Sequence, residues 1–206
     1  MRRITYIALL IIGCQYIYAQ QQYAIEILRG SVFYINGYTN VTPFTISQEI
    51  GEITGKTLTA DICKSERSVQ MLQRKFLVPV EKFQSNNPMA LRDFKKLVQS
   101  DKFPNFQLLV EDLNSISGSL THNNLGRVKV SLSIAGKTNT YEIDITGRIH
   151  TNKIAIKAKK RISIRDFNLE PPVTLFGMIR VSEWIDLELI ANLNYQPVLS
   201  SKLSSL

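Results

Sequence analysis

Apolar and polar residues alternate with a period of two over much of this 206-residue chain. The clearest runs are 128–134 (VKVSLSI) and 141–146 (YEIDIT), separated by a turn-forming stretch at 135–139 (AGKTN). Such runs bury one face of each strand, and a turn between them predicts an antiparallel hairpin. Further alternating runs lie at 154–158 and 185–191, and earlier strands are expected at 23–29, 31–36, 41–47, 53–60, 75–80 and 105–112. The pattern predicts an all-β chain.

One segment departs from this pattern and predicts a helix. Asn87 is a good N-cap residue, and Pro88 then occupies the first helical position. Apolar residues follow at helical spacing on one face, namely Ala90, Leu91, Phe94, Leu97 and Val98. We expect one amphipathic helix of about 12 residues that ends before Pro104.

Many short strands and one helix favour a closed barrel, because closure removes the strand edges that promote aggregation. A barrel of about eight strands encloses a space that side chains fill or that holds one apolar ligand. Alternation predicts an apolar inner face, but it does not distinguish a filled lumen from a hollow one. No repeat or flexible linker divides the chain, so we expect a single domain over residues 20–206.

Residues 1–19 have the pattern of a signal peptide. Arg2 and Arg3 precede an apolar run at 4–12 that is too short to span a bilayer. Two processing sites compete, one after Ala19 and the other a lipobox ending at Cys14, which would be acylated. The first is favoured, because the apolar run continues beyond Cys14. We expect export to the periplasm or cell envelope, with anchoring through Cys14 as the alternative.

Residue types argue against catalysis and metal binding. The two cysteines exclude a disulfide-rich scaffold, and the two histidines leave little for a metal site. Two carboxylate pairs, Glu142 with Asp144 and Asp186 with Glu188, have a spacing that suits acid–base chemistry. Both pairs alternate with the apolar face, so we expect them to point to solvent. We therefore expect no enzyme, no cofactor and no metal.

The formal net charge is +8, and the densest basic cluster comprises Lys153, Lys157, Lys159, Lys160, Arg161 and Arg165. It lacks the interleaved aromatic residues on which single-stranded nucleic acids stack, so we expect no nucleic-acid partner. The cluster is interpreted as a solvated face, with weak attraction to anionic lipid headgroups as the alternative. Trp184 and Tyr34 are interpreted as girdle or core aromatics.

Several short motifs, in order along residues 31–192, resemble those of the YceI-like family. Residues 31–41 (SVFYINGYTNV) resemble its opening S-x-x-x-I-x-G-x-[ST]-N-V stretch, and 76–83 (FLVPVEKF) its V-P-V-x-S-F strand. Residues 91–104 are similar to its L-K-x-x-K-Y-P helix, 132–138 (LSIAGKT) to L-x-I-x-G-x-T, and 167–172 (FNLEPP) to F-x-I-x-P-P. Ile46, where such members often carry Cys, and the long polar stretch at 65–74 depart from the pattern.

This resemblance implies a lipocalin-like, eight-stranded antiparallel barrel with the amphipathic helix packed beside it. It also implies a lumen that holds a long polyisoprenoid chain. Burial at about 25 cal/mol per Å² of apolar surface would hold a hydrocarbon without a charged clamp. Candidate lumen-lining residues are Phe76, Val78, Phe106, Leu108, Val110, Val130, Leu132, Ile143, Phe167 and Leu187. For each of them, a packed core side chain is the alternative interpretation.

Two hypotheses about function therefore stand. The first is an exported protein that binds a polyisoprenoid-like lipid for storage or transport without covalent chemistry. The second is a filled-barrel envelope protein that acts through protein–protein interaction. Peripheral or lipid-anchored membrane association, and a dimer, are compatible with either hypothesis.

Overall fold

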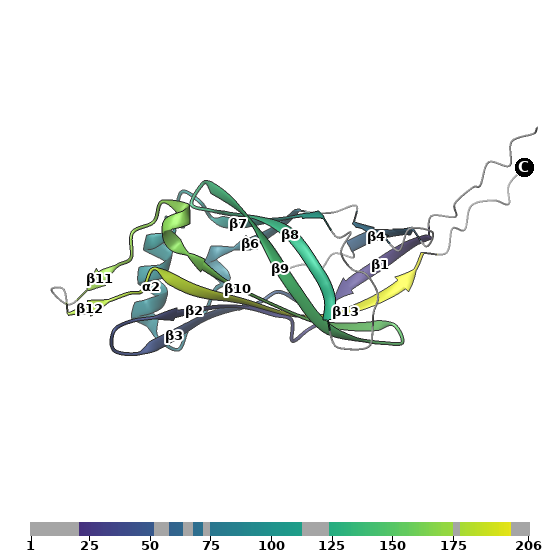
Figure 1. Ribbon diagram of the computed structural model, residues 1–206. Coiled ribbons are helices and arrows are strands. Elements are labelled where there is room, and N and C mark those ends of the chain that lie inside the picture. The colour runs from purple at the N-terminus through teal and green to yellow at the C-terminus, as the bar shows by residue number, and fades with distance from the viewer. Residues whose placement is uncertain are drawn as a thin grey trace, which may run out of the picture.

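The computed structural model describes residues 21–51, 58–63, 68–71, 75–112, 124–174 and 178–198. The expected signal peptide, with Cys14, lies outside them. In chain order the elements are β1 (Gln21–Ile27), β2 (Val32–Tyr38), β3 (Pro43–Glu49), β4 (Leu58–Cys63), β5 (Ser68–Met71), β6 (Lys75–Pro79), the 3-10 helix η1 (Val80–Lys82), α2 (Pro88–Leu97), β7 (Asn105–Asp112), β8 (Asn124–Ile134), β9 (Lys137–His150), β10 (Lys153–Ser163), the 3-10 helix η2 (Ile164–Phe167), β11 (Val173–Thr174), β12 (Ile179–Arg180) and β13 (Trp184–Pro197) (Figure 1).

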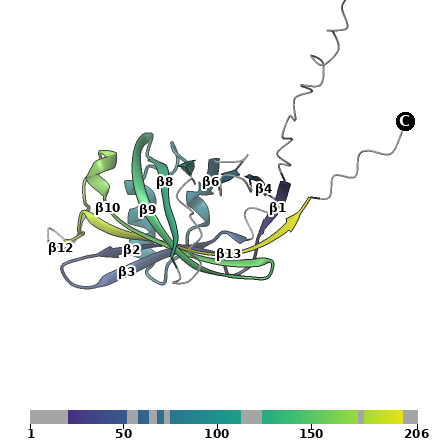
Figure 2. The ribbon, with the colours of Figure 1, turned by 45° about the vertical axis from the view of Figure 1, so that its right-hand side comes forward.

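The long strand β13 organises the sheet. It pairs with β10 along one edge, from Lys153–Asn194 to Ser163–Trp184. Along its other edge, its first half pairs with β2 and its second half with β1. β2 then continues to β3, and β1 continues to β4 and β5. Figure 2 shows β13 extending from the β12 end of the molecule to the β1 end.

Eight antiparallel strands curl into a half-barrel in the order β3-β2-β13-β10-β9-β8-β7-β6. Between β3 and the chain that follows β6, Ser47 and Gln84 exchange two backbone hydrogen bonds, both of 2.8 Å. This bridge joins β3 to the segment that follows η1, beyond the end of β6. The predicted fold class is therefore confirmed.

The β8–β9 hairpin is tighter than the sequence pattern suggested. Its turn consists of Ala135 and Gly136 alone, because Ile134 already pairs with Lys137. Both turn residues have positive φ, 48° and 79° respectively. Two positive φ values match the twist of the adjoining strands, so pairing continues directly out of the turn.

The predicted helix is confirmed as α2, the one α-helix among the described residues. The side chain of Asn87 accepts a 3.1 Å hydrogen bond from the amide of Ala90, and Pro88 follows the cap. Phe94 turns inward and packs against Phe83 and Phe106, with ring centroids 5.4 and 6.0 Å away. The helix thus covers the core at one end of the half-barrel. Within the described residues, no helix is long and apolar enough to cross a membrane.

Candidate ligand-binding cavity

Strand register places the nine predicted lumen residues that lie in strands on one face of the sheet. Phe76 is opposite Leu108, and Val110 is opposite Val130. Directly paired residues of an antiparallel sheet share a face, and side chains two apart along a strand do so too. The buried residues Phe106, Val130 and Leu132 identify this face as the inner one.

A cavity of about 170 Å³ lies at the α2 end of this inner face. Its deep wall is entirely apolar. Lining residues there include Phe33, Ile35, Phe44, Ile46, Phe94, Leu97, Val98, Phe106, Leu132, Ile134, Ile162, Ile164, Phe167, Leu169, Ile185 and Leu187. Polar lining side chains belong to the turns and the helix at the mouth, namely Thr39, Thr42, Asn87, Asp93 and Ser182.

The ten predicted lining residues divide into three groups. Phe106, Leu132, Phe167 and Leu187 line the cavity. Val78 and Leu108 pack against the same core cluster without lining the cavity. Phe76, Val110, Val130 and Ile143 lie further along the strands, outside both the cavity wall and that cluster. A role in ligand contact stays a prediction for all ten.

Several lining residues were absent from the predicted set. Ile35 and Ile46 continue the alternation of two predicted strands, so the period-two signal could have identified them. Phe94 lies on the predicted apolar face of the helix, and a helix closing the barrel end would have assigned it to the lumen. Val41 began the predicted strand at 41–47, out of phase with Ile46, but it lies in the turn before β3, and Ile179 lies in a two-residue strand too short to show a period.

One wall of the cavity forms where β9 and β10 separate. Their register ends at Ala158 and Ile145, although both strands continue past that point. Beyond it, η2 lies against β9, because Asp166 accepts hydrogen bonds from Tyr141 (3.0 Å) and Asn139 (2.6 Å). Lys160 spans the gap from β10, and its Nζ donates to the carbonyl of Glu142 at 2.9 Å.

Tyr141 supports this wall from behind, because it packs against the core cluster without lining the cavity. Burial and its hydrogen bond to Asp166 raise the pKa of the Tyr141 phenol, so the phenol stays neutral and donates. Its ring packs on Phe167, with centroids 6.4 Å apart, and Lys160 lies 6.0 Å from the ring centroid. These contacts fix Phe167 where it lines the cavity.

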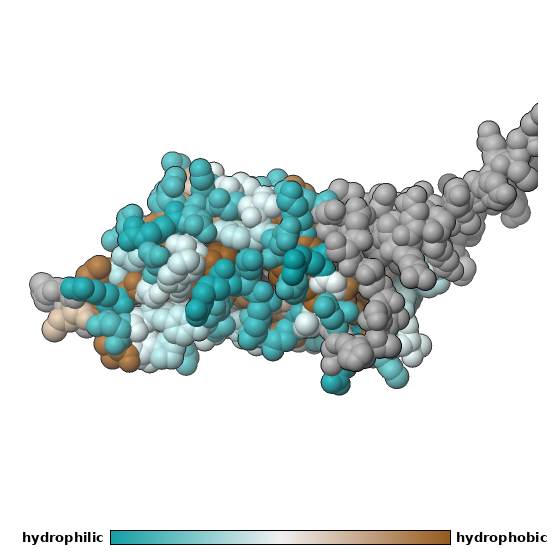
Figure 3. Space-filling model, in the orientation of Figure 1, coloured by the Kyte–Doolittle hydropathy of each residue, from teal (hydrophilic) through white to brown (hydrophobic). Residues whose placement is uncertain are grey.

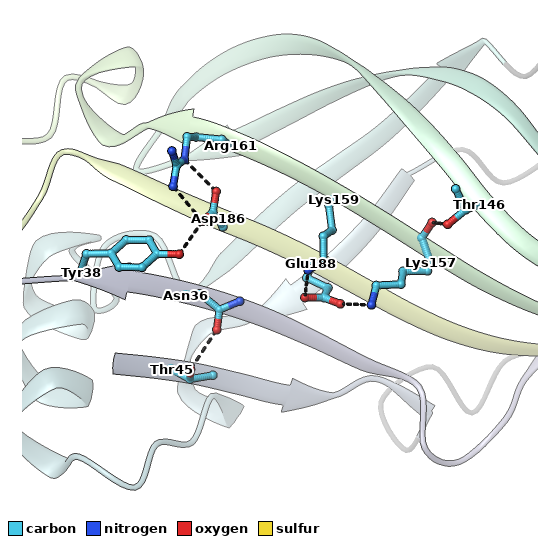
Figure 4. A network of polar contacts seen from close by, with 9 residues as sticks. All are labelled: Asn36, Tyr38, Thr45, Thr146, Lys157, Lys159, Arg161, Asp186 and Glu188. Atoms are coloured by element: carbon cyan, nitrogen blue, oxygen red, sulfur yellow. Dashed lines mark hydrogen bonds and ion pairs between the residues drawn. The ribbon is translucent and has the colours of Figure 1, made fainter. Parts of the chain in front are cut away.

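The outer face carries ion pairs at the predicted carboxylate pair of Asp186 and Glu188. Asp186 accepts from Tyr38 at 2.7 Å and from Arg161 at 2.9 Å, while Glu188 lies 2.9 Å from both Lys157 and Lys159 (Figure 4). Hydrogen bonds from Arg161 and Tyr38 lower the pKa of Asp186. Partial burial opposes a lower pKa for Glu188, but the two lysines outweigh it.

Both carboxylates are therefore ionised and neutralised at neutral pH, and neither lines the cavity. The basic cluster is largely paired as well, since Arg165 also contacts Glu183 and Glu170, at 2.7 Å each. Within the described ranges, no group of three or more potential metal ligands is present.

The model of the YceI-like domain family matches residues 30–193. The chain belongs to the YceI-like domain family. The resemblance inferred from short motifs is thereby confirmed. YceI-like domains are in general binding proteins without catalytic activity. No curated protein matches the chain.

Solved structures with the same fold include a polyisoprenoid binding domain from Saccharophagus degradans implicated in plant cell wall breakdown. It is 9% identical, with a TM-score of 0.52 and coverage of 84% of this chain and 98% of that one. Burkholderia cenocepacia BcnA is 11% identical, with a TM-score of 0.53 and coverage of 78% and 95%. A cysteine variant of a Campylobacter jejuni YceI protein is 13% identical, with a TM-score of 0.50 and coverage of 66% and 79%. At these identities the likeness establishes the fold alone.

Proposed function

We propose that this YceI-like protein binds a long apolar, polyisoprenoid-like lipid in its barrel lumen. The role is storage or transport, without covalent chemistry. The observation that carries this proposal is the distribution of polarity in the cavity. The deep wall is apolar, and the polar lining side chains are confined to the mouth. Such a site holds a hydrocarbon chain inside and leaves any polar end near solvent.

Burial energetics support the same ligand class. At about 25 cal/mol per Å², an apolar chain gains affinity in proportion to the area that leaves water. The apolar deep wall of the cavity supplies the surface for that burial. The polyisoprenoid binding domain with the same fold supports this choice among hydrocarbons.

Native mass spectrometry of the protein from its own host, with organic extraction of any bound mass, tests the proposal. We expect a reproducible adduct that extracts as a long-chain prenyl lipid. Leu187→Trp places a bulky ring in the cavity wall and should abolish the adduct. Leu77→Trp is the control, because Leu77 is 53% exposed on the outer face of β6. A wild-type protein that stays free of lipid after prenyl lipids are added would favour the filled-barrel alternative.

We also propose that the protein is exported and functions in the periplasm or cell envelope. The basic and apolar pattern of residues 1–19 supports this localisation. The intact mass of the mature protein tests it. A chain beginning at Gln20 indicates ordinary cleavage, an acylated chain beginning at Cys14 indicates a lipid anchor, and an uncleaved chain in the cytoplasm contradicts export.

A further inference from the structure

The mouth of the cavity carries a cluster of exposed apolar side chains. Val41 is 69% exposed, Met178 67%, Val173 61% and Met89 48%. We call these four residues the rim. Val41 comes from the β2–β3 turn, Val173 from β11 and Met89 from α2, and Met178 directly precedes β12. Figure 3 shows hydrophobic surface at the end of the molecule where β11 and β12 lie.

The rim is continuous with the cavity. Val41 and Met89 line the cavity as well as facing solvent, and Ile179 and Val181 line it beside Met178. An apolar surface that begins outside the protein therefore leads directly into the lumen. A contiguous apolar patch exposed on a protein surface typically marks a site that binds a ligand, a protein or a membrane.

Hydrogen bonds hold the rim in place. The Asn40 side chain donates to the carbonyl of Met178 at 2.9 Å and accepts from the amide of Arg180 at 2.8 Å. The amide of Asn40 also donates to the carbonyl of Arg180, at 3.1 Å. Asn40 thereby links the β2–β3 turn to β12. These hydrogen bonds fix the backbone on which the exposed side chains of Val41 and Met178 are carried.

Aromatic side chains stand behind the rim on the outer face. Tyr38 ends β2 and is 37% exposed, and Trp184 begins β13 and is 47% exposed. The amide of Ser182 donates to the carbonyl of Tyr38, which places the two strand ends side by side. Tyr and Trp with exposed rings are typical of the boundary between water and lipid, because they combine an apolar body with a polar group.

Cationic groups flank the rim. Arg92 follows Met89 by one helical turn, and Arg180 lies two residues after Met178; both are exposed. The neighbouring carboxylate of Asp93 is 3.6 Å from Arg92, which offsets its charge. Guanidinium groups beside an apolar tip complement the phosphates of lipid headgroups.

We propose that the rim docks on a lipid bilayer, with its four apolar side chains in the interface and Tyr38 and Trp184 at headgroup level. The cavity mouth then opens against the acyl chains. This inference rests on the proposed lipid-binding function. Its physical reason is that a long apolar chain leaving a membrane through water would expose its whole surface, at about 25 cal/mol per Å². A cavity mouth docked on the bilayer reduces the apolar surface of the lipid that water contacts.

A bilayer fits this surface better than a second copy of the chain. A stable protein interface uses about 20–30 residues on each side. The rim offers only four side chains, which stand on separate turns around the cavity mouth. Two copies facing each other through their rims would leave the space between the two mouths unfilled. A fluid bilayer needs no shape complementarity and accommodates isolated tips.

Binding to phosphatidylcholine vesicles, with and without phosphatidylglycerol, tests the proposal. The chain has a single tryptophan, so its fluorescence reports on Trp184, which stands behind the rim. We expect a blue shift on vesicle addition and quenching by lipids with brominated acyl chains. The double variant Val173→Ser with Met178→Ser should partition about tenfold less, because each lost side chain removes apolar burial. Neither residue lines the cavity.

The matched control is Leu77→Ser with Leu109→Ser, two exposed leucines on the outer faces of β6 and β7. It should partition like the wild type. An equal loss in this control, or no response of Trp184, would overturn the proposal. So would a concentration-dependent dimer that the rim variant abolishes without any vesicle binding.

Native mass spectrometry tests membrane docking separately from the proposed lipid binding. The rim variant, loaded with prenyl lipid from detergent, should carry the same adduct as the wild type. A wild type that binds vesicles but never carries lipid contradicts the proposed function. A wild type that carries lipid but ignores vesicles contradicts the docking inference alone.

Discussion

Gln48 places an amide in the interior of the half-barrel without a partner. It lies two residues after Ile46 on β3, so both side chains face inward, and it is 2% exposed. Within the described part of the chain, its Oε1 and Nε2 lack hydrogen-bond partners. An unpaired buried polar group costs about 1–3 kcal/mol.

Replacement of this amide should therefore stabilise the protein. We expect Gln48→Leu to raise the free energy of unfolding in urea by about 1–3 kcal/mol, since it removes the desolvation cost at similar volume. Gln84→Leu, at an exposed position of the β3 bridge, should change it by less than about 0.5 kcal/mol. A loss of stability in Gln48→Leu would mean that a bound molecule satisfies the amide.

Gly37 leaves room for the tip of the Phe44 ring, which lines the cavity. The two residues are paired across β2 and β3, and a Cβ at Gly37 would stand 2.2 Å from Cζ of Phe44. Gly37→Ala must displace the ring, so we expect a loss of about 1–3 kcal/mol in unfolding free energy. Adding Phe44→Leu should recover part of that loss, and strictly additive effects would contradict the packing argument.

At the scale of elements, the start of α2 depends on one side chain. Asn87 caps the helix through Ala90, and the helix closes the cavity end. Asn87→Ala should cost about 1 kcal/mol of stability in thermal or urea unfolding. Asn86→Ala, one residue earlier and exposed, is the control and should be nearly neutral. An equal loss in both variants would assign the effect to the loop rather than to the cap.

The pairing of β2, β10 and β13 predicts a dependence on pH. Asp186 on β13 joins Arg161 on β10 and Tyr38 on β2, and these contacts lower its pKa in the folded protein. A carboxylate with a lowered folded pKa adds stability above its unfolded value of about 3.9, and loses it as the pH falls through the folded value. Asp186→Asn should therefore flatten the fall in urea midpoint on acidification below about pH 4. An unchanged acid profile would show that the contacts do not contribute.

Sequence patterns predicted elements well where a local rule decides them. Period two located β8, β9 and β10 because each has one buried face, and the Asn87-Pro88 pair located the start of α2. The separation of β9 from β10 beyond Ala158 had no such signal, because η2 takes the place of β10 beside β9 through contacts between residues distant in sequence. For the same reason, Phe106 and Val130 appeared equivalent in sequence, yet only Phe106 lines the cavity.

At the scale of the whole molecule, the cavity mouth and the ends of the described chain lie at opposite ends. Figure 1 places α2, β11 and β12 at one end, and Figure 2 shows β1 with the end of β13 at the other. A tether preceding β1 would therefore leave the mouth free to approach a separate lipid surface. Because the two lie at opposite ends, docking of the cavity mouth on a membrane does not depend on whether the chain before β1 is anchored.

Loading of the lumen should stabilise the whole fold, because a ligand that binds only the folded state adds RT ln(1 + [L]/Kd). At a hundredfold excess over Kd this is about 2.7 kcal/mol, or a rise of roughly 5–10 °C in Tm for a chain of this size. Leu187→Trp, with the cavity filled, should show no rise when prenyl lipid is added. The rim variant Val173→Ser with Met178→Ser should show the full rise after loading from detergent, but a slower rise when vesicles supply the lipid. Equal rates from vesicles for the wild type and the rim variant would separate lipid uptake from membrane docking.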